Sequence, residues 1–583
     1  MRRILPFLAL VTACSGGSTP EPEDPTKTPD IYTPRWAFEP WISKDISDGP
    51  DTYAFVEGFK SRDIPVGVVV LDSPWETDYN TFDPNPERYP EMPKMIADLR
   101  AEGVRTVLWI TQMLNVESFD VEAGGDTYDS PSVEYLIAER EQYFVNDGET
   151  FFWWKGKGSG IDFSDDVGRA WWHGLQDDLL DAGIAGWKLD FGESYVMTDT
   201  VKTDAGVISH QEYSEEYYRD FWAYGANRLG TDEFVTMVRP YDKSYNFEGR
   251  FFARPEHAPV TWVGDNRRDY VGMIDALDHM FRSAEANYVV IGSDIGGYLD
   301  RDDQSFTDLV PYDTDTFLRW TALGAMTPFM QLHGRANLEP WSVPERADET
   351  VDTYRYWATL HHELVPFLYS LAEDAYDVGG PMMHPIGDGP DAWEDDWRFV
   401  LGEAFLVAPI FEASGVRDVP LPRGAKWYDW WAPQDDAHDG GTTLAAYDVG
   451  SPSRIPLFVR AGAIVPMTID RPLTEIGTEA FADHLTVLVY PGATASSFVL
   501  RDSDDGKTEI AAEGGAVSIS RTLAPTIFVV RTDTPPTEVD GLSSVADIAA
   551  VAASNGGWFY DASRRATYVK VPASSDPTTV TIR

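Results

Sequence analysis

Short apolar runs rich in β-branched residues recur along the chain and alternate with longer amphipathic segments. The runs span residues 64–71, 104–110, 183–189, 234–238 and 287–293. Such runs indicate strands that are buried on both faces, as in a parallel sheet covered by helices. We therefore expect an α/β fold, a (β/α)8 TIM barrel with insertions, although a doubly wound open sheet would give a similar pattern.

The clearest helix between these runs leads into the strand 183–189. It is expected to end near Gly183 and to carry four apolar residues on one stripe: Val167, Trp171, Leu175 and Leu179. The strand that follows delivers Asp190 at its carboxyl end.

Polar side chains fall repeatedly at the carboxyl ends of the expected strands. They are Asp72, Trp109, Gln112, Asp190, Arg239 and Asp294. In a barrel these ends converge on one mouth, where active sites are built. Asp190 is therefore expected to point into a shared pocket.

After about residue 375 the helical periodicity stops, and short alternating runs are separated by Gly, Pro and Asp-Gly signals, as in β-sandwiches. A second block of this kind extends to the C-terminus. In chain order we expect four parts: 1–30 leader and tether, 31–375 barrel, 376–470 proximal β-sandwich, 471–583 distal β domain.

The N-terminus carries two Arg before a short apolar run that ends in Val-Thr-Ala-Cys, which resembles a bacterial lipoprotein signal. Cys14 is the only cysteine of the chain. We expect export across the inner membrane and lipid attachment at Cys14, followed by a flexible tether that holds the protein in the cell envelope. A plain signal peptide or an incidental cysteine is the alternative.

The charge balance limits the possible partners. The chain has 96 Asp and Glu against 46 Lys and Arg, a formal net charge of -50. This excess argues against nucleic acid and against an anionic membrane surface, so membrane contact is expected only through the N-terminal lipid. The 20 Trp and 27 Tyr leave aromatic side chains to line a sugar site.

Two carboxylates that face each other across a glycosidic bond can act as nucleophile and general acid/base. Spacing alone leaves a Schiff-base enzyme open, because Lys188 precedes Asp190 by two positions and shares its strand face. A metal site is disfavoured, since the ten His form no H-x-x-H type cluster.

The segments "GWKLDFGE", "VTWVGDN", "GSDIGGY" and "PFMQLHGRANLEPW", in this order, resemble glycoside hydrolase family 31, the retaining α-glucosidase and α-xylosidase group. The resemblance runs from about Trp36 to at least Met467 and includes "VVVLDSPW" and "LGEAFLVAPI". It implies a (β/α)8 barrel, a carbohydrate substrate and no cofactor.

The resemblance also implies roles for individual residues. Asp190 matches the nucleophile and Asp265 the general acid/base. The residues that match the sugar pocket are Asp72, Asp294 and His333 for the hydroxyls, and Trp109, Trp187 and Trp262 for the aromatic wall. Glu193 is expected either to orient its neighbours or to contact the substrate.

This sequence departs from the family in several places. Gln331 replaces the usual Arg before the family's His, and Arg335 is a candidate to compensate. Arg239 and Arg254 both compete for the sugar-binding Arg, and we favour Arg254 because it lies nearer Asp265 in the sequence. Members usually carry a β-sandwich before the barrel; here the barrel pattern begins almost at once, which predicts a more open pocket.

The expected function is exo-acting hydrolysis of a terminal α-linked sugar through a covalent glycosyl-enzyme, with net retention. Glycosyl transfer on the same fold is one alternative. A catalytically silent, lipid-anchored carbohydrate-binding protein is the other. The sequence leaves the sugar and its linkage open.

Overall fold

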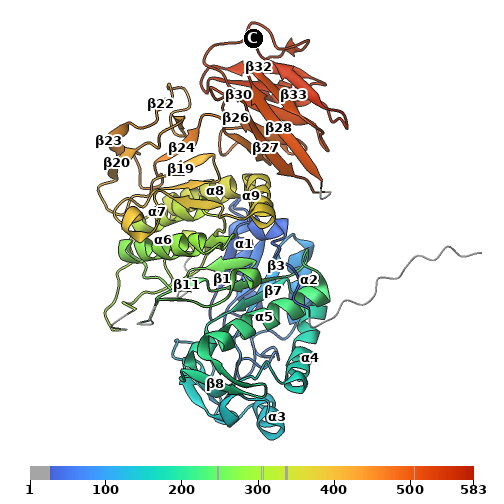
Figure 1. Ribbon diagram of the computed structural model, residues 1–583, viewed down its shortest axis with the longest axis vertical. Helices are drawn as coiled ribbons and strands as arrows, with labels where there is room; N and C mark the ends of the chain where they lie inside the picture. The colour runs from blue at the N-terminus through green and yellow to red at the C-terminus, as the bar shows by residue number, and fades with distance from the viewer. Residues whose placement is uncertain (1–26, 246–248, 304, 306, 335–338, 504–505) are drawn as a thin grey trace, which may run out of the picture.

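A parallel β-barrel forms the first part of the computed structural model, which describes residues 27–245, 249–303, 305, 307–334, 339–503 and 506–583 (Figure 1). Its sheet has the strand order β14-β13-β10-β7-β3-β2-β1-β16-β15. The edge strands β14 (Ile291–Gly292) and β15 (Asp294–Ile295) belong to one segment interrupted at Ser293. Because β14 pairs with β13 and β15 with β16, this segment joins the two edges. The TIM-barrel prediction is confirmed, and the open sheet is excluded.

The expected strands are present, and helices surround them (Figure 1). The other barrel strands are β1 (Trp41–Lys44), β2 (Val68–Leu71), β3 (Arg105–Ile110), β7 (Gly186–Leu189), β10 (Val235–Val238), β13 (Val260–Trp262) and β16 (Gln331–Leu332). The helices that accompany them are α1 (Gly49–Lys60), α2 (Met92–Ala101), α4 (Asp166–Ala182), α5 (His210–Leu229), α6 (Tyr270–Glu285), α7 (Thr314–Ala325), α8 (Ala347–Glu363) and α9 (Val365–Val378).

Helix α4 ends as expected at Gly183, whose φ of 94° lies in the left-handed region that favours glycine. Its buried face differs from the expected stripe. Leu179 is buried, but Val167 is 65% exposed, and Trp172 rather than Trp171 lies in the core. Trp172 packs edge-on against Phe82. The helix therefore directs Trp172, and not the preceding Trp171, toward the barrel.

The long connection from β3 to α4 builds a small sheet of its own at the carboxyl end of the barrel. It contains β4 (Met113–Ser118), α3 (Val133–Glu141), β5 (Phe151–Trp153) and β6 (Gly156–Gly160). A hairpin of β8 (Thr200–Thr203) and β9 (Gly206–Ser209) follows β7, and a short pair of β11 (Tyr241–Asp242) and β12 (Arg250–Phe251) follows β10. These additions extend the wall of the barrel mouth.

Two β-rich parts follow α9 and lie on the opposite side of the barrel from the β8 hairpin (Figure 1). The first contains β17 (Met383–Pro385), α10 (Pro390–Trp393), β18 (Phe399–Leu401), β19 (Phe405–Val407), β20 (Val416–Pro420), β21 (Lys426–Asp429), β22 (His438–Asp439), β23 (Thr443–Asp448) and β24 (Leu457–Arg460). The second contains β25 (Ile464–Met467), β26 (Leu485–Val489), β27 (Ser496–Arg501), β28 (Lys507–Glu513), β29 (Ala516–Ile519), β30 (Thr526–Arg531), β31 (Ser543–Ser544), α11 (Ile548–Ala553), β32 (Gly557–Asp561), β33 (Ala566–Val571) and β34 (Thr578–Thr581).

Strand β25 marks the change from one β-rich part to the next. It falls inside the range 376–470 expected for the proximal domain, yet it pairs with β26 in the distal sheet. The distal part has its own apolar core between a six-stranded and a four-stranded sheet. The structural change of sheet therefore comes between Arg460 and Ile464, slightly earlier than expected.

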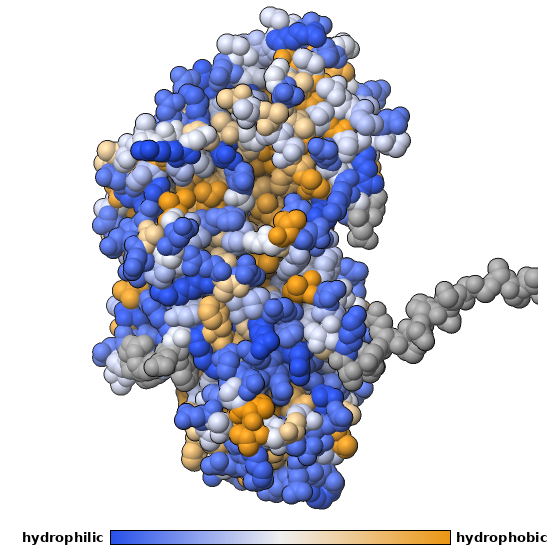
Figure 2. Space-filling view, viewed as in Figure 1, coloured by the Kyte–Doolittle hydropathy of each residue, from blue (hydrophilic) through white to orange (hydrophobic). Residues whose placement is uncertain are grey.

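The surface fits the strong net charge. The face shown in Figure 2 is mostly hydrophilic, with hydrophobic residues in scattered groups. Within the part of the chain that the structure describes, no helix combines the length and apolar character needed to cross a bilayer. Cys14, the expected lipid-attachment residue, lies outside the described residues.

Gly292 gives a direct test of barrel closure. A Cβ at this position would lie 2.1 Å from the Phe329 carbonyl oxygen, so Gly292→Ala must push β14 away from its neighbour. We expect a loss of about 1–3 kcal/mol, measured by urea unfolding. The control is Gly174→Ala on α4, where nothing lies within 4 Å of the added Cβ and helix propensity improves. An unchanged midpoint for Gly292→Ala would contradict this packing.

Candidate active site

The carboxyl ends of the barrel strands enclose a cavity of about 970 Å³. Its wall includes five of the residues expected from the sequence: Asp72, Trp109, Asp190, Asp265 and His333. Each strand brings its residue to the mouth because parallel strands end at the same edge of the sheet. Several strand ends therefore meet at one site, as the alternating pattern predicts.

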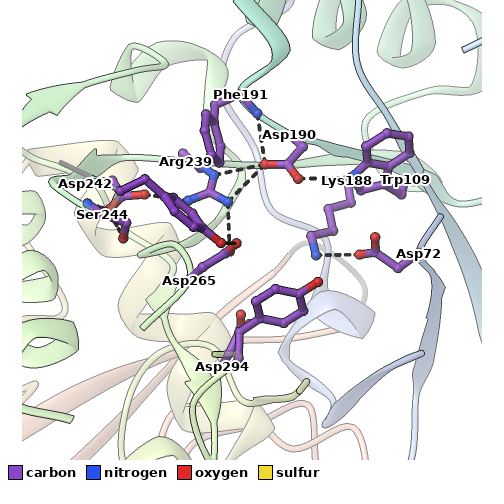
Figure 3. Close-up of polar contacts among 12 residues, drawn as sticks. Asp72, Trp109, Lys188, Asp190, Phe191, Arg239, Asp242, Ser244, Asp265 and Asp294 are labelled. Atoms are coloured by element: carbon purple, nitrogen blue, oxygen red, sulfur yellow. Dashed lines mark hydrogen bonds and ion pairs between the residues drawn. The ribbon is translucent and has the colours of Figure 1, made fainter. Parts of the chain in front are cut away.

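Arg239 lies between the two central carboxylates. Its Nη2 is 3.0 Å from Asp190 Oδ1 and 2.8 Å from Asp265 Oδ1, and its Nη1 contacts Asp242 (Figure 3). Since one nitrogen touches both, these two oxygens are no more than about 6 Å apart. The guanidinium is fully buried, so its contacts hold both acids in a fixed relation.

The surroundings of Asp190 favour its charged form. Burial alone would raise the pKa of Asp190, but Arg239, Lys188 and two hydrogen bonds bring the pKa below its ordinary value. Trp109 Nε1 donates to Oδ2 at 3.0 Å, and the Phe191 amide donates to Oδ1 at 2.9 Å. Arg239 and Phe191 both use Oδ1, which leaves Oδ2 with the Trp109 indole as its donor among the described residues. Oδ2 keeps a lone pair for chemistry.

The pKa of Asp265 is shifted in the opposite direction to that of Asp190. Burial, and then the negative charge of Asp190, raise its pKa above the ordinary value, although Arg239 and the Tyr245 hydroxyl oppose the shift. Tyr245 donates to Asp265 Oδ2 at 2.6 Å. One carboxyl therefore stays charged while its neighbour retains a proton more readily, which is the arrangement that general acid/base chemistry with a nucleophile needs.

A second cation occupies the other side of the pocket. Lys188 Nζ lies 2.6 Å from Asp72 Oδ2 (Figure 3). The same nitrogen lies 3.3 Å from His333 Nε2. Burial opposes the charge of Lys188, but Asp72 and further carboxylates raise its pKa above the ordinary value. A charged amine is not a nucleophile, so the Schiff-base alternative loses its support.

The Lys188 ammonium also disfavours metal binding at this side of the pocket. Asp45, Asp72 and His333 each offer a ligand atom, and these atoms lie within 4.8 Å of one another. The Lys188 ammonium already contacts Asp72 and His333, so a metal ion there would have to displace a paired positive charge. These residues therefore fit a metal ion poorly.

Two expected residues lie directly behind the pocket wall. Asp294 is fully buried and accepts a hydrogen bond from Gln331 at 2.7 Å, and burial raises its pKa to about 8. Trp262 lies under Lys188 and Arg239, which sit 5.0 and 4.8 Å from its ring centroid. Both residues support the groups that line the cavity.

Glu193 binds protein rather than facing the cavity. Its Oε1 accepts from Arg250 at 3.1 Å and from Ser214 at 3.2 Å, and its side chain is fully buried. Burial raises its pKa to about 7. Of its two expected roles, the contacts fit orientation of the loop after Asp190.

Two of the expected sugar contacts are wrong. Arg254 has a side chain that is 58% exposed, pairs with Glu215 and does not line the cavity, whereas Arg239 takes the position between the acids. Trp187 points to the helix layer and packs against Phe82 and Phe221. Because Lys188 faces the pocket, strand alternation places Trp187 on the outer face.

Other residues of the wall were not found from the sequence. They include Asp45, Ile46, Glu122, Trp154, Lys155, Tyr245, Tyr298 and Arg301. Asp45 follows β1 as Asp72 follows β2, so its strand-end position was a usable signal. The remaining ones lie on connections without periodicity. Arg335 lies outside the described residues.

Comparison with known proteins follows the same division of the chain. The family model described as "Glycosyl hydrolases family 31 TIM-barrel domain" matches residues 31–371, and the model for the family's C-terminal domain matches residues 378–465. Curated relatives include Alpha-glucosidase 2 of Bacillus thermoamyloliquefaciens, 26% identical over 82% of this chain and 58% of its own length. An alpha-xylosidase of Emericella nidulans is 23% identical over 74% of this chain and 53% of its own length.

Among solved structures, the cycloalternan-forming enzyme of Listeria monocytogenes in complex with a pentasaccharide substrate has a TM-score of 0.79. It is 21% identical, and the match covers 95% of this chain and 55% of that one. At this identity the likeness shows the fold. The chain spans just over half the length of each of these three proteins.

The role of Arg239 can be separated from that of Arg254 by stability. Arg239→Ala leaves buried carboxylates without their cation, so we expect a loss of about 3–5 kcal/mol at neutral pH. Arg254→Ala removes a pair whose cation is exposed to solvent, and it should change stability by less than about 1 kcal/mol. Urea unfolding measures both.

The stability that Arg239 supplies should depend on pH, and the direction of this dependence follows from the pKa of Asp190. Arg239 lowers the pKa of Asp190, so the stability that it supplies is complete above the ordinary carboxyl range and declines as pH falls below about 4. Equal stability of the two variants at neutral pH would contradict the central position of Arg239.

Proposed function

Because the chain belongs to glycosyl hydrolase family 31, we propose that it is a retaining, exo-acting α-glycoside hydrolase that releases a terminal α-linked sugar. The observation that carries this proposal is the Asp190–Arg239–Asp265 bridge, which holds one oxygen of each acid within about 6 Å of the other. Retaining enzymes use separations of about 5–5.5 Å, whereas inverting enzymes need about 6.5–9.5 Å to admit water.

In the first step Asp190 Oδ2 attacks the anomeric carbon, and the bond to the leaving oxygen breaks. Asp265 gives its proton to that oxygen, so the aglycone leaves as an alcohol. The raised pKa of Asp265 and the lowered pKa of Asp190 support this division of roles. The product of the step is a glycosyl ester on Asp190.

In the second step Asp265, now a carboxylate, removes a proton from water, and the hydroxide oxygen bonds to the anomeric carbon as the ester bond to Asp190 breaks. Two inversions restore the α configuration. Arg239 contacts both acids, and so it can stabilise the negative charge on either of them as the charge passes from one to the other.

The exo mode is supported by the shape of the site. Lys188 and Asp72 line the cavity from inside the barrel, and residues that follow several barrel strands contribute to its wall. The connection from β3 to α4 adds Glu122, Trp154 and Lys155. A pocket walled in this way accepts the end of a glycan rather than its middle.

The charges favour a neutral sugar. Lys155 is paired with Asp120 and Glu122, both at 2.8 Å, and Lys188 is paired with Asp72. Arg301 of the same wall lies 3.8 Å from Asp300. These cations are already neutralised, and they are not placed to bind a sulfonate or carboxylate on the substrate. An anionic glycoside would instead meet an excess of acids.

Glycosyl transfer is the second candidate, because it shares the first step and differs only in what attacks the ester. The similarity to a cycloalternan-forming enzyme supports this candidate. The silent binding protein has less support, since both acids are present, bridged and oppositely shifted in pKa.

Substitution of the two acids tests the reaction. On an aryl α-glycoside, Asp190→Ala should lose about 10³-fold or more in kcat, since the ester cannot form. Asp265→Ala should lose less with a good leaving group, which needs no protonation.

With azide added, Asp190→Ala should yield the inverted glycosyl azide and Asp265→Ala the retained one, as identified by NMR. The reverse assignment would contradict the roles of the two acids.

We also propose that residues 1–30 direct export and that Cys14 carries the lipid that anchors the protein in the cell envelope. The support is the short apolar run after two Arg and the position of the sole cysteine at its end. Expressed with this segment in bacteria, the protein should enter the detergent phase of a phase-separation assay, and Cys14→Ser should enter the aqueous phase. Equal partition of both would contradict lipid attachment.

A further inference from the structure

Asp45 is a buried acid at the pocket for which the reaction has no use. It follows β1 directly, is 2% exposed and lines the cavity. Neither of its carboxyl oxygens has a hydrogen-bond partner among the described residues. Buried polar groups are nearly always satisfied, and one that is left unpaired is costly, so its partner is expected from the ligand.

The neighbouring histidine does not supply that partner. His333 Nε2 lies 3.6 Å from Asp45 Oδ1, beyond hydrogen-bond length. Lys188 has only donor hydrogens and lies 3.3 Å from the same nitrogen, so Nε2 must act as the acceptor there. Burial, followed by Lys188, lowers the pKa of His333 far below its ordinary value, which keeps the ring neutral. Nε2 therefore has no proton to give to Asp45.

The backbone next to Asp45 is held in an unfavourable conformation. Ile46 has a φ of 46°, a left-handed value that a β-branched residue rarely adopts. Its amide donates to the Ser73 carbonyl oxygen at 3.1 Å, which ties the segment after β1 to the segment after β2. Strain of this kind persists where the surrounding structure enforces it, and it is common at ligand sites.

The position of Asp45 relative to the reacting groups indicates which part of a bound sugar lies next to it. Asp45 groups with Asp72 and His333, whereas Asp190 and Asp265 group around Arg239. Lys188 runs from the strand that carries Asp190 toward Asp72 (Figure 3). A sugar ring whose anomeric carbon faces Asp190 turns its opposite side, which carries the C4 and C6 hydroxyls, toward the Asp45 group.

We infer that Asp45 is a specificity-determining residue that hydrogen-bonds the C4 or C6 hydroxyl of a neutral sugar in the pocket. The inference rests on the proposed glycosidase function. A site that is built to bond a hydroxyl rejects the analogue that lacks it much more strongly than a merely apolar pocket would, because the buried polar group is then left unpaired. Asp45 thus helps to select the sugar, while Asp190 and Asp265 carry out the reaction.

The test couples a change in the protein to a change in the substrate. Parent, Asp45→Asn and Asp45→Ala are assayed for kcat/KM on the aryl α-glycoside that the parent hydrolyses best, and on its 2-deoxy, 4-deoxy and 6-deoxy analogues. We expect the parent to lose about 10²-fold or more when the 4- or 6-hydroxyl is removed. Asp45→Ala should lose a similar factor on the full sugar and almost nothing further on that deoxy analogue.

The controls separate this role from a general one. Removal of the 2-hydroxyl should affect parent and Asp45→Ala equally. Asp51→Asn alters an acid on α1 that pairs with Lys44 of β1, and it should keep the parent's preference. Asp45→Asn keeps the volume and serves if Asp45→Ala does not fold. Equal losses on every sugar, or no loss, would overturn the inference and leave the glycosidase intact. A parent inactive on all glycosides would overturn the proposed function, and this inference with it.

Discussion

The site depends on one buried guanidinium surrounded by carboxylates. Arg239 has no exposed surface and contacts Asp190, Asp242 and Asp265. A charge so deeply buried is strongly unfavourable unless it is paired, and the carboxylates could not remain so close together without it. The pairing therefore works in both directions. It fixes the separation of the two central acids, and it holds Asp190 charged beside a more basic Asp265.

The barrel makes this arrangement possible through strand register. Met237 of β10 pairs with Lys188 of β7, and Val238 pairs with Thr261 of β13. Arg239 follows between these neighbours and reaches acids that lie after both. Lys188 has the corresponding role toward Asp72 on the other side. Two inward cations thus organise the acids of the mouth, and Asp45, which neither cation contacts within hydrogen-bond distance, is left for the substrate.

Much of this could be predicted from the sequence, because buried parallel strands have a distinct apolar pattern and their polar ends meet at one edge. The errors have physical reasons. Arg254 is closer to Asp265 along the chain, but the connection between β10 and β13 carries it outward to Glu215 on α5. For Trp187 the sequence did contain the necessary signal. Side chains alternate along a strand, so a residue next to the inward-facing Lys188 must face the helix layer. The wall from the β3–α4 connection could not be predicted, since no periodic pattern positions its residues.

Trapping of the covalent intermediate would identify the nucleophile without relying on a variant. The reagent is a 5-fluoro α-glycosyl fluoride of the preferred sugar. Its 5-fluorine slows both formation and hydrolysis of the glycosyl ester, and hydrolysis should become slow enough for the ester to accumulate. Mass spectrometry should then find one glycosyl unit per chain, on the peptide that contains Asp190. Turnover of the natural-type glycoside without any adduct, or an adduct on a peptide other than that of Asp190, would contradict the assignment of Asp190 as the nucleophile.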